Sequence, residues 1–131
     1  MEPYVGSAGK RTPEKHAMRE ADLYNPIRLA AVPFGCVLFR NNTGVLQDRH
    51  GQYVRYGLGV GSSDLIGWTT HHGLAMFTAI EVKRPGKKTT KEQDAFLLAV
   101  RHAGGIGLCV HSVEEFEELM RLHTHHLLCS G

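Results

Sequence analysis

The sequence has few cysteines, no long apolar run and little net charge. Its 131 residues include three cysteines, an odd number with no two close together, which argues against a disulfide framework and favours a reducing compartment. No segment approaches the roughly 18 apolar residues that cross a bilayer, and the first residues lack the apolar stretch of a signal peptide. We therefore expect a cytoplasmic protein with no membrane contact.

The length and composition fit one compact domain. Apolar residues make up 42% of the chain and charged residues 21%, which is enough apolar material for a core. The first residues mix glycine, serine, proline and charge, and the last residues carry no clear pattern. We predict a flexible N-terminal tail over 1–11, a single domain over 12–123 and a C-terminal tail over 124–131.

The net charge of +2 says little about partners, but the distribution of charge says more. Five basic residues and no acid occur between Lys83 and Lys91, whereas Glu114–Glu118 holds four glutamates and no base. The basic run can meet a polyanion such as nucleic acid, although a solvated surface explains it equally well.

Strand-like and helix-like segments alternate along the chain. A break in the first helix is expected near Asn25–Pro26, and Thr90 with Gln93, like Ser112 with Glu115, has the spacing of a capping box. The expected helices are 14–31, 90–103 and 112–123, and the expected strands are 35–40, 64–68, 76–83 and 106–111. The polar segment 45–52 is ambiguous, and 53–60 (YVRYGLGV) alternates and is either a strand or an ordered loop. This order predicts an α/β fold with a mixed β-sheet flanked by helices, in which an antiparallel hairpin lies beside a parallel pair.

This arrangement of strands predicts that two carboxylates, those of Asp64 and Glu81, lie close together. Glu81 and Lys83 share a face of their strand because side chains alternate with period two. A tight turn at His72–Gly73 brings Asp64 directly opposite Glu81, with Cβ atoms about 5 Å apart. Two carboxylates at that distance repel each other unless a cation lies between them, and a divalent metal suits this better than Lys83 alone.

Such a constellation supports hydrolysis of a phosphodiester bond. Asp64, Glu81 and a backbone carbonyl can hold Mg²⁺ or Mn²⁺, which acidifies water and stabilises charge on a phosphoryl oxygen. Lys83 can orient or deprotonate the attacking water, and the basic run after it can meet the flanking phosphates. By itself, Glu-x-Lys on a strand is more often a surface salt bridge.

Three segments together resemble the virus-type replication-repair nuclease family, VRR-NUC, of the PD-(D/E)xK nuclease superfamily. They are Gly61–Gly67 (GSSDLIG), Ile80–Arg84 (IEVKR) and the helical segment Thr89–Gly105 that contains Gln93. The segment Cys109–Glu115 is similar to the closing strand and helix of that family, and Arg40–Gly44 to a segment of its compact members. The likeness covers about half of the chain, and Ser63 departs from it, since a proline often precedes the aspartate.

The resemblance implies a restriction-endonuclease-like fold and Mg²⁺- or Mn²⁺-dependent cleavage of DNA by a standalone, homodimeric enzyme. It implies metal ligands at Asp64, Glu81 and the Val82 carbonyl, and catalytic roles for Lys83 and Gln93. A glutamate of the first helix also faces the metal in such proteins, and we expect Glu20 there, with Glu14 as the alternative. The residues that we expect to contact DNA are Arg40, Asn42, Ser62, Ser63, Arg84, Lys87, Lys88 and Lys91.

The expected function is therefore a structure-selective DNA nuclease, acting on junctions, flaps or branched DNA in replication, repair or phage DNA processing, in a bacterial cell or a phage-infected host. The alternative is a non-catalytic DNA-structure-binding protein on the same fold. A weaker alternative is a zinc-binding interaction domain that uses His123, His125, His126 and Cys129, whose spacing matches no zinc motif well. Trp68 is expected in the core.

Overall fold

This computed structural model describes the backbone of residues 18–129 and the side chains as far as His125. Helices and strands follow in the order 3₁₀-helix η1 (Glu20–Leu23), α1 (Tyr24–Ala31), 3₁₀-helix η2 (Val32–Phe34), β1 (Cys36–Arg40), β2 (Gly44–Gln47), β3 (Tyr53–Tyr56), β4 (Leu65–His71), β5 (Leu74–Val82), α2 (Lys91–His102), β6 (Ile106–Val110) and α3 (Val113–Cys129). No helix within the described range is long and apolar enough to span a bilayer.

The main sheet has four strands in the order β1-β4-β5-β6. β1 pairs with β4 and β4 with β5 in antiparallel fashion, whereas β5 and β6 are parallel and joined through α2. The expected mixed sheet, with an antiparallel hairpin beside a parallel pair, is therefore confirmed. The architecture is α/β and consistent with a restriction-endonuclease-like fold.

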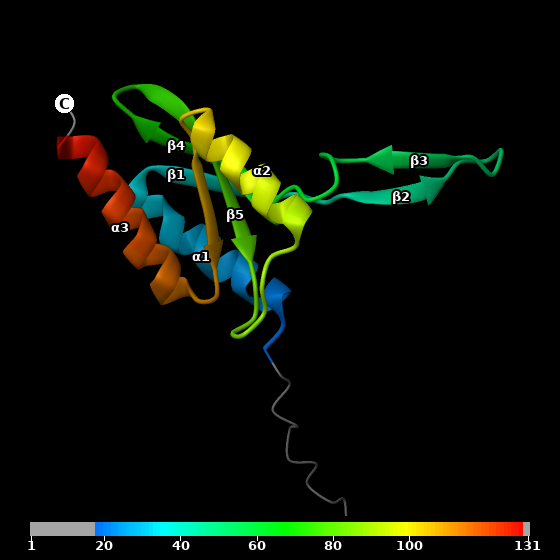
Figure 1. Ribbon diagram of the computed structural model, residues 1–131, viewed down its shortest axis with the longest axis horizontal. Helices are drawn as coiled ribbons and strands as arrows, with labels where there is room; N and C mark the ends of the chain where they lie inside the picture. The colour runs from blue at the N-terminus through cyan, green and yellow to red at the C-terminus, as the bar shows by residue number, and fades with distance from the viewer. Residues whose placement is uncertain (1–17, 130–131) are drawn as a thin grey trace, which may run out of the picture.

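Helices cover both faces of this sheet (Figure 1). On one face α1 and α3 enclose the larger core, where Ile27, Leu65, Ile80 and Phe116 are fully buried. On the other face α2 packs Leu97 and Val100 against Ala79. Because α2 lies against β5 and β6, the far half of this face is left open. The two faces thus differ sharply in how much apolar surface they bury.

Exposed apolar side chains gather beside α2 on the same face of the sheet and form an aromatic patch of Val37, Phe39 and Trp68 on β1 and β4 and of Phe77 on β5, next to α2. Trp68 is 39% exposed, and its ring centroid lies 5.7 Å from that of Phe39. The expectation that Trp68 belongs to the core is therefore wrong, because α2 packs mainly on β5 and β6 and leaves the Trp68 side chain partly exposed. Exposed apolar surface of this extent commonly marks an interaction site.

Several element boundaries differ from those expected. α1 begins at Tyr24 with Pro26 inside its first turn, where a missing N–H costs nothing. α3 continues past His123 to Cys129, through the segment expected as a C-terminal tail. Glu14, the tail over 1–11 and the domain start at residue 12 lie outside the described residues.

The segment between β1 and β4 holds a second sheet that the sequence left ambiguous. β2 and β3 form a two-stranded antiparallel hairpin, which projects from the body of the protein (Figure 1). β3 lies within the segment 53–60, for which a strand was one of the two expected alternatives, whereas β2 was not expected. Neither strand has a buried residue, so no buried face marks the pair in the sequence.

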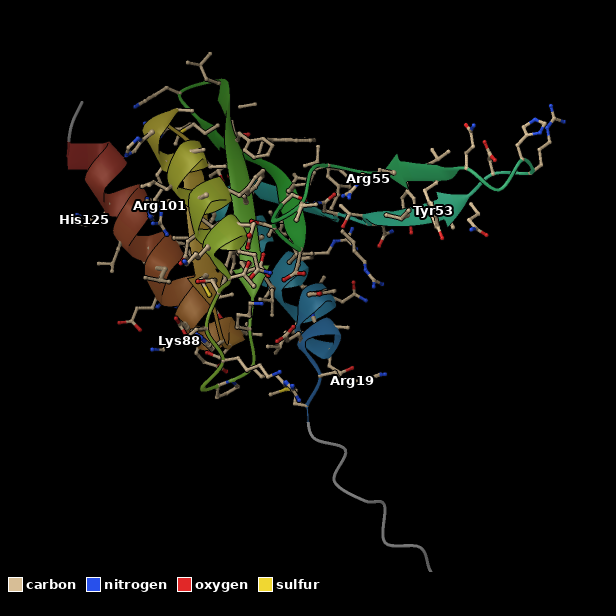
Figure 2. The ribbon with its side chains drawn as sticks, turned by 45° about the vertical axis from the view of Figure 1, so that its right-hand side comes forward. Arg19, Tyr53, Arg55, Lys88, Arg101 and His125 are labelled. Atoms are coloured by element: carbon tan, nitrogen blue, oxygen red, sulfur yellow. The ribbon has the colours of Figure 1, made fainter. Side chains whose placement is uncertain are left out.

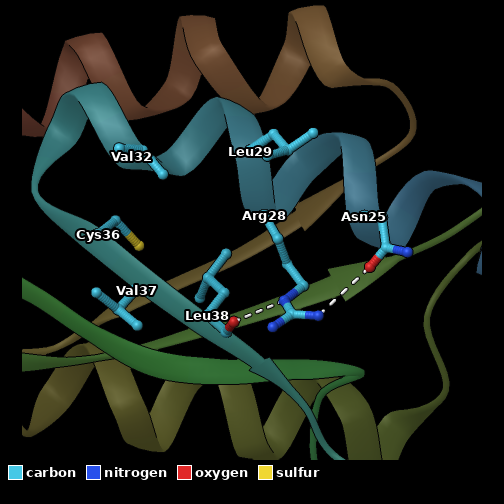
Figure 3. A pocket seen from close by; sticks show the side chains of 7 residues that line it. All are labelled: Asn25, Arg28, Leu29, Val32, Cys36, Val37 and Leu38. Atoms are coloured by element: carbon cyan, nitrogen blue, oxygen red, sulfur yellow. Dashed lines mark hydrogen bonds between the residues drawn. The ribbon is translucent and has the colours of Figure 1, made fainter.

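β1 is an outer strand of the main sheet, since only β4 pairs with it. Arg28 of α1 reaches this edge, where its Nε donates to the Leu38 carbonyl oxygen at 2.8 Å and its Nη1 donates to Asn25 Oδ1 at 3.3 Å (Figure 3). Both contacts lie in a hollow of about 510 Å³ that Leu29, Val32 and Val37 also line. α1 is thus tied to the outer strand by a charged side chain as well as by the core.

Candidate active site

The β4–β5 hairpin builds the centre of the site. His72 and Gly73 both have positive φ, 48° and 74°, as a two-residue turn of this kind requires. Trp68 pairs with Phe77 and Leu65 with Ile80, so the next pair outward is Asp64 and Glu81. The register expected from the turn is therefore confirmed, and it brings the two carboxylates together.

Glu81, on β5, is 2% exposed, and Gln93 of α2 contacts its side chain. Its Oε1 accepts a hydrogen bond from Gln93 Nε2 at 2.9 Å and lies 3.7 Å from Lys83 Nζ. Its Oε2 is buried and has no hydrogen-bond partner among the described residues. Burial, and then the charge of Asp64, raise the pKa of Glu81 from 4.5 to about 8, against the lowering effect of Lys83.

Asp64 is held at the start of β4 by backbone contacts. Its Oδ2 accepts the Val82 N–H at 2.8 Å, and its carbonyl oxygen accepts the Asn41 N–H at 2.8 Å. The Asn41 side chain fixes the preceding turn, because its Nδ2 donates to Ser62 Oγ and to the Ser63 carbonyl oxygen, both at 2.9 Å. The aspartate is thereby oriented before any ligand arrives.

Gln93 connects the site to the start of α2. Its Oε1 accepts the Thr90 N–H at 2.9 Å, and its own N–H donates to Thr90 Oγ1 at 3.2 Å, so the expected capping box is confirmed. Since Oε1 is used by the cap, the amide nitrogen must point the other way, toward Glu81. One side chain therefore both begins a helix and donates to a buried carboxylate.

Glu20 lies at the edge of the same site, on η1. Its Oε1 accepts the Arg84 N–H at 3.3 Å, and its charge contributes to the raised pKa of Glu81 and of Tyr24. The structure thus brings Asp64, Glu81, Lys83, Gln93 and Glu20 into one place, as the sequence predicted.

Two residues of this region were missed at the sequence level. Tyr24 lies beside Asp64, and burial together with that carboxylate raises the pKa of its hydroxyl. The Arg40 guanidinium lies 5.4 Å from the Tyr24 ring centroid. The only signal was the helical i, i+4 spacing of Glu20 and Tyr24, which points both toward one side. Tyr56 of β3 was also missed, because its contact with this region depends on the hairpin.

The residues expected to contact DNA differ in how far they are exposed to solvent. Arg40 and Asn42 are exposed and line a hollow of about 600 Å³ that also contains Asp64 and Tyr56. Lys87, Lys88 and Lys91 are exposed, and Ser62 and Arg84 are partly so.

Ser63 is 1% exposed, so the expectation that its side chain contacts DNA is wrong. Its place in the turn before Asp64 turns the hydroxyl inward, where it has no hydrogen-bond partner among the described residues.

The donor set fits a hard divalent cation held by two carboxylates. The Val82 N–H donates to Asp64 and the Gln93 amide donates to Glu81, while Glu81 Oε2 is buried and has no hydrogen-bond partner among the described residues. No group of three or more His, Cys, Asp or Glu side chains within the described range is arranged to bind one metal. Mg²⁺ commonly binds to one or two carboxylates and retains water elsewhere.

The same finding gives no support to a zinc site at the end of α3. His123 and His125 are described and belong to no such group, while the side chains of His126 and Cys129 lie outside the described ones. Burial raises the pKa of the Cys36 and Cys109 thiols, as expected for unreactive cysteines.

The buried carboxylate should cost stability in the absence of a cation. The folded state keeps the Glu81 proton up to about pH 8, whereas the unfolded chain releases it near 4.5, so stability falls as the pH rises across that window. We expect Glu81→Gln with a chelator to raise the Tm at pH 8 by roughly 5 °C, and to change it little at pH 4.5. Thermal melts of both proteins at the two pH values test this, with Glu118→Gln on exposed α3 surface as the matched control. An unchanged Tm at pH 8 would contradict the account.

Comparison with known proteins assigns the chain to a family. A scan against protein-family profiles matches residues 36–114 to the VRR-NUC domain. Searches of curated proteins and of solved structures find no match. The matched range is more than half of the chain, runs from β1 to the start of α3, and includes the Asp64, Glu81, Lys83 and Gln93 positions. The chain therefore belongs to the VRR-NUC family, a family of nuclease domains.

Proposed function

We propose that this protein is a Mg²⁺- or Mn²⁺-dependent DNA nuclease that cleaves phosphodiester bonds at the Asp64–Glu81 pair. The observation that carries the proposal is the buried Glu81 carboxylate, with one unpartnered oxygen, directly beside Asp64. A structural salt bridge does not need a second carboxylate at this position, whereas a metal site does.

The residues of the site have separable roles in this proposal. Asp64, Glu81 and the Val82 carbonyl would hold the metal, which supplies positive charge for the phosphoryl oxygens and acidifies water when bound. Lys83, whose side chain is 13% exposed, orients the attacking water or accepts its proton. Glu20, which accepts the Arg84 N–H, would contribute a further carboxylate at the edge of the metal site.

The surroundings of the site suit a nucleic-acid substrate. Lys87, Lys88 and Lys91 follow the site in the loop before α2 and at its first turn, and Arg40 and Asn42 line the hollow at Asp64. These groups can contact phosphates on either side of the cut strand. We propose that the preferred substrates are branched DNAs, such as flaps or four-way junctions, in replication, repair or phage DNA processing.

Cleavage of labelled duplex, flap and four-way-junction DNA with Mg²⁺ or Mn²⁺ tests this function. We expect wild-type protein to cut the branched DNAs, and Asp64→Asn and Lys83→Met each to reduce the rate at least about 100-fold. Glu118→Gln is the folding and purity control. Binding without cutting by the wild type would instead favour a DNA-binding protein, and equal cutting of all three DNAs would remove the structural preference.

Gln93 is proposed as a positioning residue, since it acts through Glu81. We expect Gln93→Ala to lower kcat about tenfold and to raise the metal concentration needed for half-maximal rate, with KM for DNA unchanged. Thr90→Ala is the matched control, because it removes the other half of the capping box and leaves the Gln93–Glu81 contact. If both variants lose stability and activity in parallel, Gln93 has only a helix-capping role.

We also propose that the enzyme acts as a homodimer, and two surfaces compete for the interface. The aromatic patch of Val37, Phe39, Trp68 and Phe77 offers an apolar face, and exposed Leu122 on α3 marks the alternative. Sedimentation velocity should show a dimer for wild type and for Leu122→Glu, but a monomer for Phe77→Glu. The reverse result would assign the interface to α3, and a monomeric wild type would end the dimer proposal.

A further inference from the structure

The β2–β3 hairpin is the feature that the proposed active site leaves unused. It forms a sheet of its own, and every residue from Val45 to Val60 is exposed. Figure 2 shows it reaching away from the body with Tyr53 and Arg55 along it, at the opposite end of the protein from Arg101 and His125. An isolated two-stranded hairpin is only marginally stable in water, so this one is suited to a partner.

The charge of the hairpin and its base fits a polyanion. Between Arg40 and Ser63 there are three arginines, Arg40, Arg49 and Arg55, and a single acid, Asp48. The Asp48 Oδ1 is occupied within the turn, where it accepts the N–H groups of His50 at 2.8 Å and Gln52 at 2.9 Å. The arginines thus outnumber the one acid, whose Oδ1 is held within the turn, so the segment keeps a net positive charge toward an incoming phosphate.

The tip is held in shape although nothing packs on it. Besides the Asp48 side-chain contacts, the Asp48 N–H donates to the Gln52 carbonyl and the Gly51 N–H donates to the Asp48 carbonyl, at 2.8 and 3.0 Å. Gly51 has a φ of 75°, which closes the turn. Arg49 and His50 are thus presented on a preformed turn, which lowers the ordering cost of binding.

The base of the hairpin leads directly to the proposed catalytic centre. Tyr56 of β3 lines the hollow of about 600 Å³ that contains Asp64, Arg40 and Asn42. Arg55, on the other side of the same strand, lines a second hollow of about 350 Å³ that extends along the loop to Gly61. A strand of DNA whose phosphate lies at Asp64 would continue along this arm.

We propose that the β2–β3 hairpin is an arm that binds the sugar–phosphate backbone of a DNA duplex beside the scissile bond, a role that rests on the proposed function. Arg49 and Arg55 contact phosphates, and Tyr53, which shares a face with Arg55, packs against the sugars. A two-stranded ribbon has the width of the major groove, where it can lie without reading the sequence.

The length of the arm sets how much duplex it covers. From Gly44 to Arg49 it extends about 17–20 Å at ~3.4 Å per residue. This corresponds to about five or six base pairs on one side of the cut. For DNA with fewer base pairs on that side of the cut, the arm should not increase the binding affinity.

Binding and cleavage measured side by side test the arm. Fluorescence anisotropy on a labelled duplex of about 30 base pairs uses the full chain with Asp64→Asn, so that no DNA is cut, over a range of salt concentrations. We expect Arg55→Ala to weaken binding and Arg121→Ala, a matched loss of charge on α3, to leave it unchanged. The pair Arg49→Ala and Arg55→Ala together should weaken binding roughly tenfold and reduce the slope of log K against log salt by about 2.

Steady-state cleavage by the same arm variants, with Asp64 intact, separates this inference from the proposed function. A raised KM with unchanged kcat supports the arm. If wild type cleaves and the arm variants match it in KM and salt slope, the arm inference fails and the nuclease stands. If wild type cuts no DNA yet the salt slope falls, the nuclease fails and the arm stands. Conversion of a dimer to a monomer by the arm variants would overturn the inference in favour of a contact between copies.

Discussion

The pairing of Asp64 with Glu81 across β4 and β5 dominates the energetics of the site. Two carboxylates, one of them 2% exposed, are held together against both repulsion and desolvation. The groups that offset this cost are the Val82 N–H, the Gln93 amide and the Lys83 ammonium. Because they come from β5 and α2, the site is complete only when the sheet and the crossover helix are both in place.

Much of this centre could be predicted because short-range geometry determines it. A two-residue turn at His72–Gly73 fixes the strand register, and the register then fixes which side chains face each other. The capping box is equally local, since Thr90 and Gln93 are three residues apart. Placing Glu20 near the pair needed the family resemblance as well, because no spacing rule links η1 to β5.

The errors arose where tertiary packing decides. Trp68 was expected in the core because large aromatic residues on a strand are usually buried. However, α2 covers only part of the sheet face on which Trp68 lies, and no local sequence pattern reveals how far a helix extends over a sheet. Ser63 reads as an exposed turn residue, yet the Asn41 side chain draws its turn inward. The segment 53–60 alternates and was expected as a strand or an ordered loop, but the β2–β3 pairing was not predicted, because its strands bury nothing and the segment 45–52 is ambiguous in sequence.

The Arg28–Leu38 contact has a consequence for how copies of this chain can meet. An outer strand with free carbonyls is a template on which another chain can add a strand, and natural proteins often protect such strands with charged side chains. Here a guanidinium occupies the Leu38 carbonyl on β1 (Figure 3). A strand from another molecule that pairs with β1, as in fibril formation, must first displace the hydrogen bond between Arg28 and the Leu38 carbonyl. The contact that ties α1 to β1 therefore also makes the addition of a further strand along β1 less favourable at Leu38.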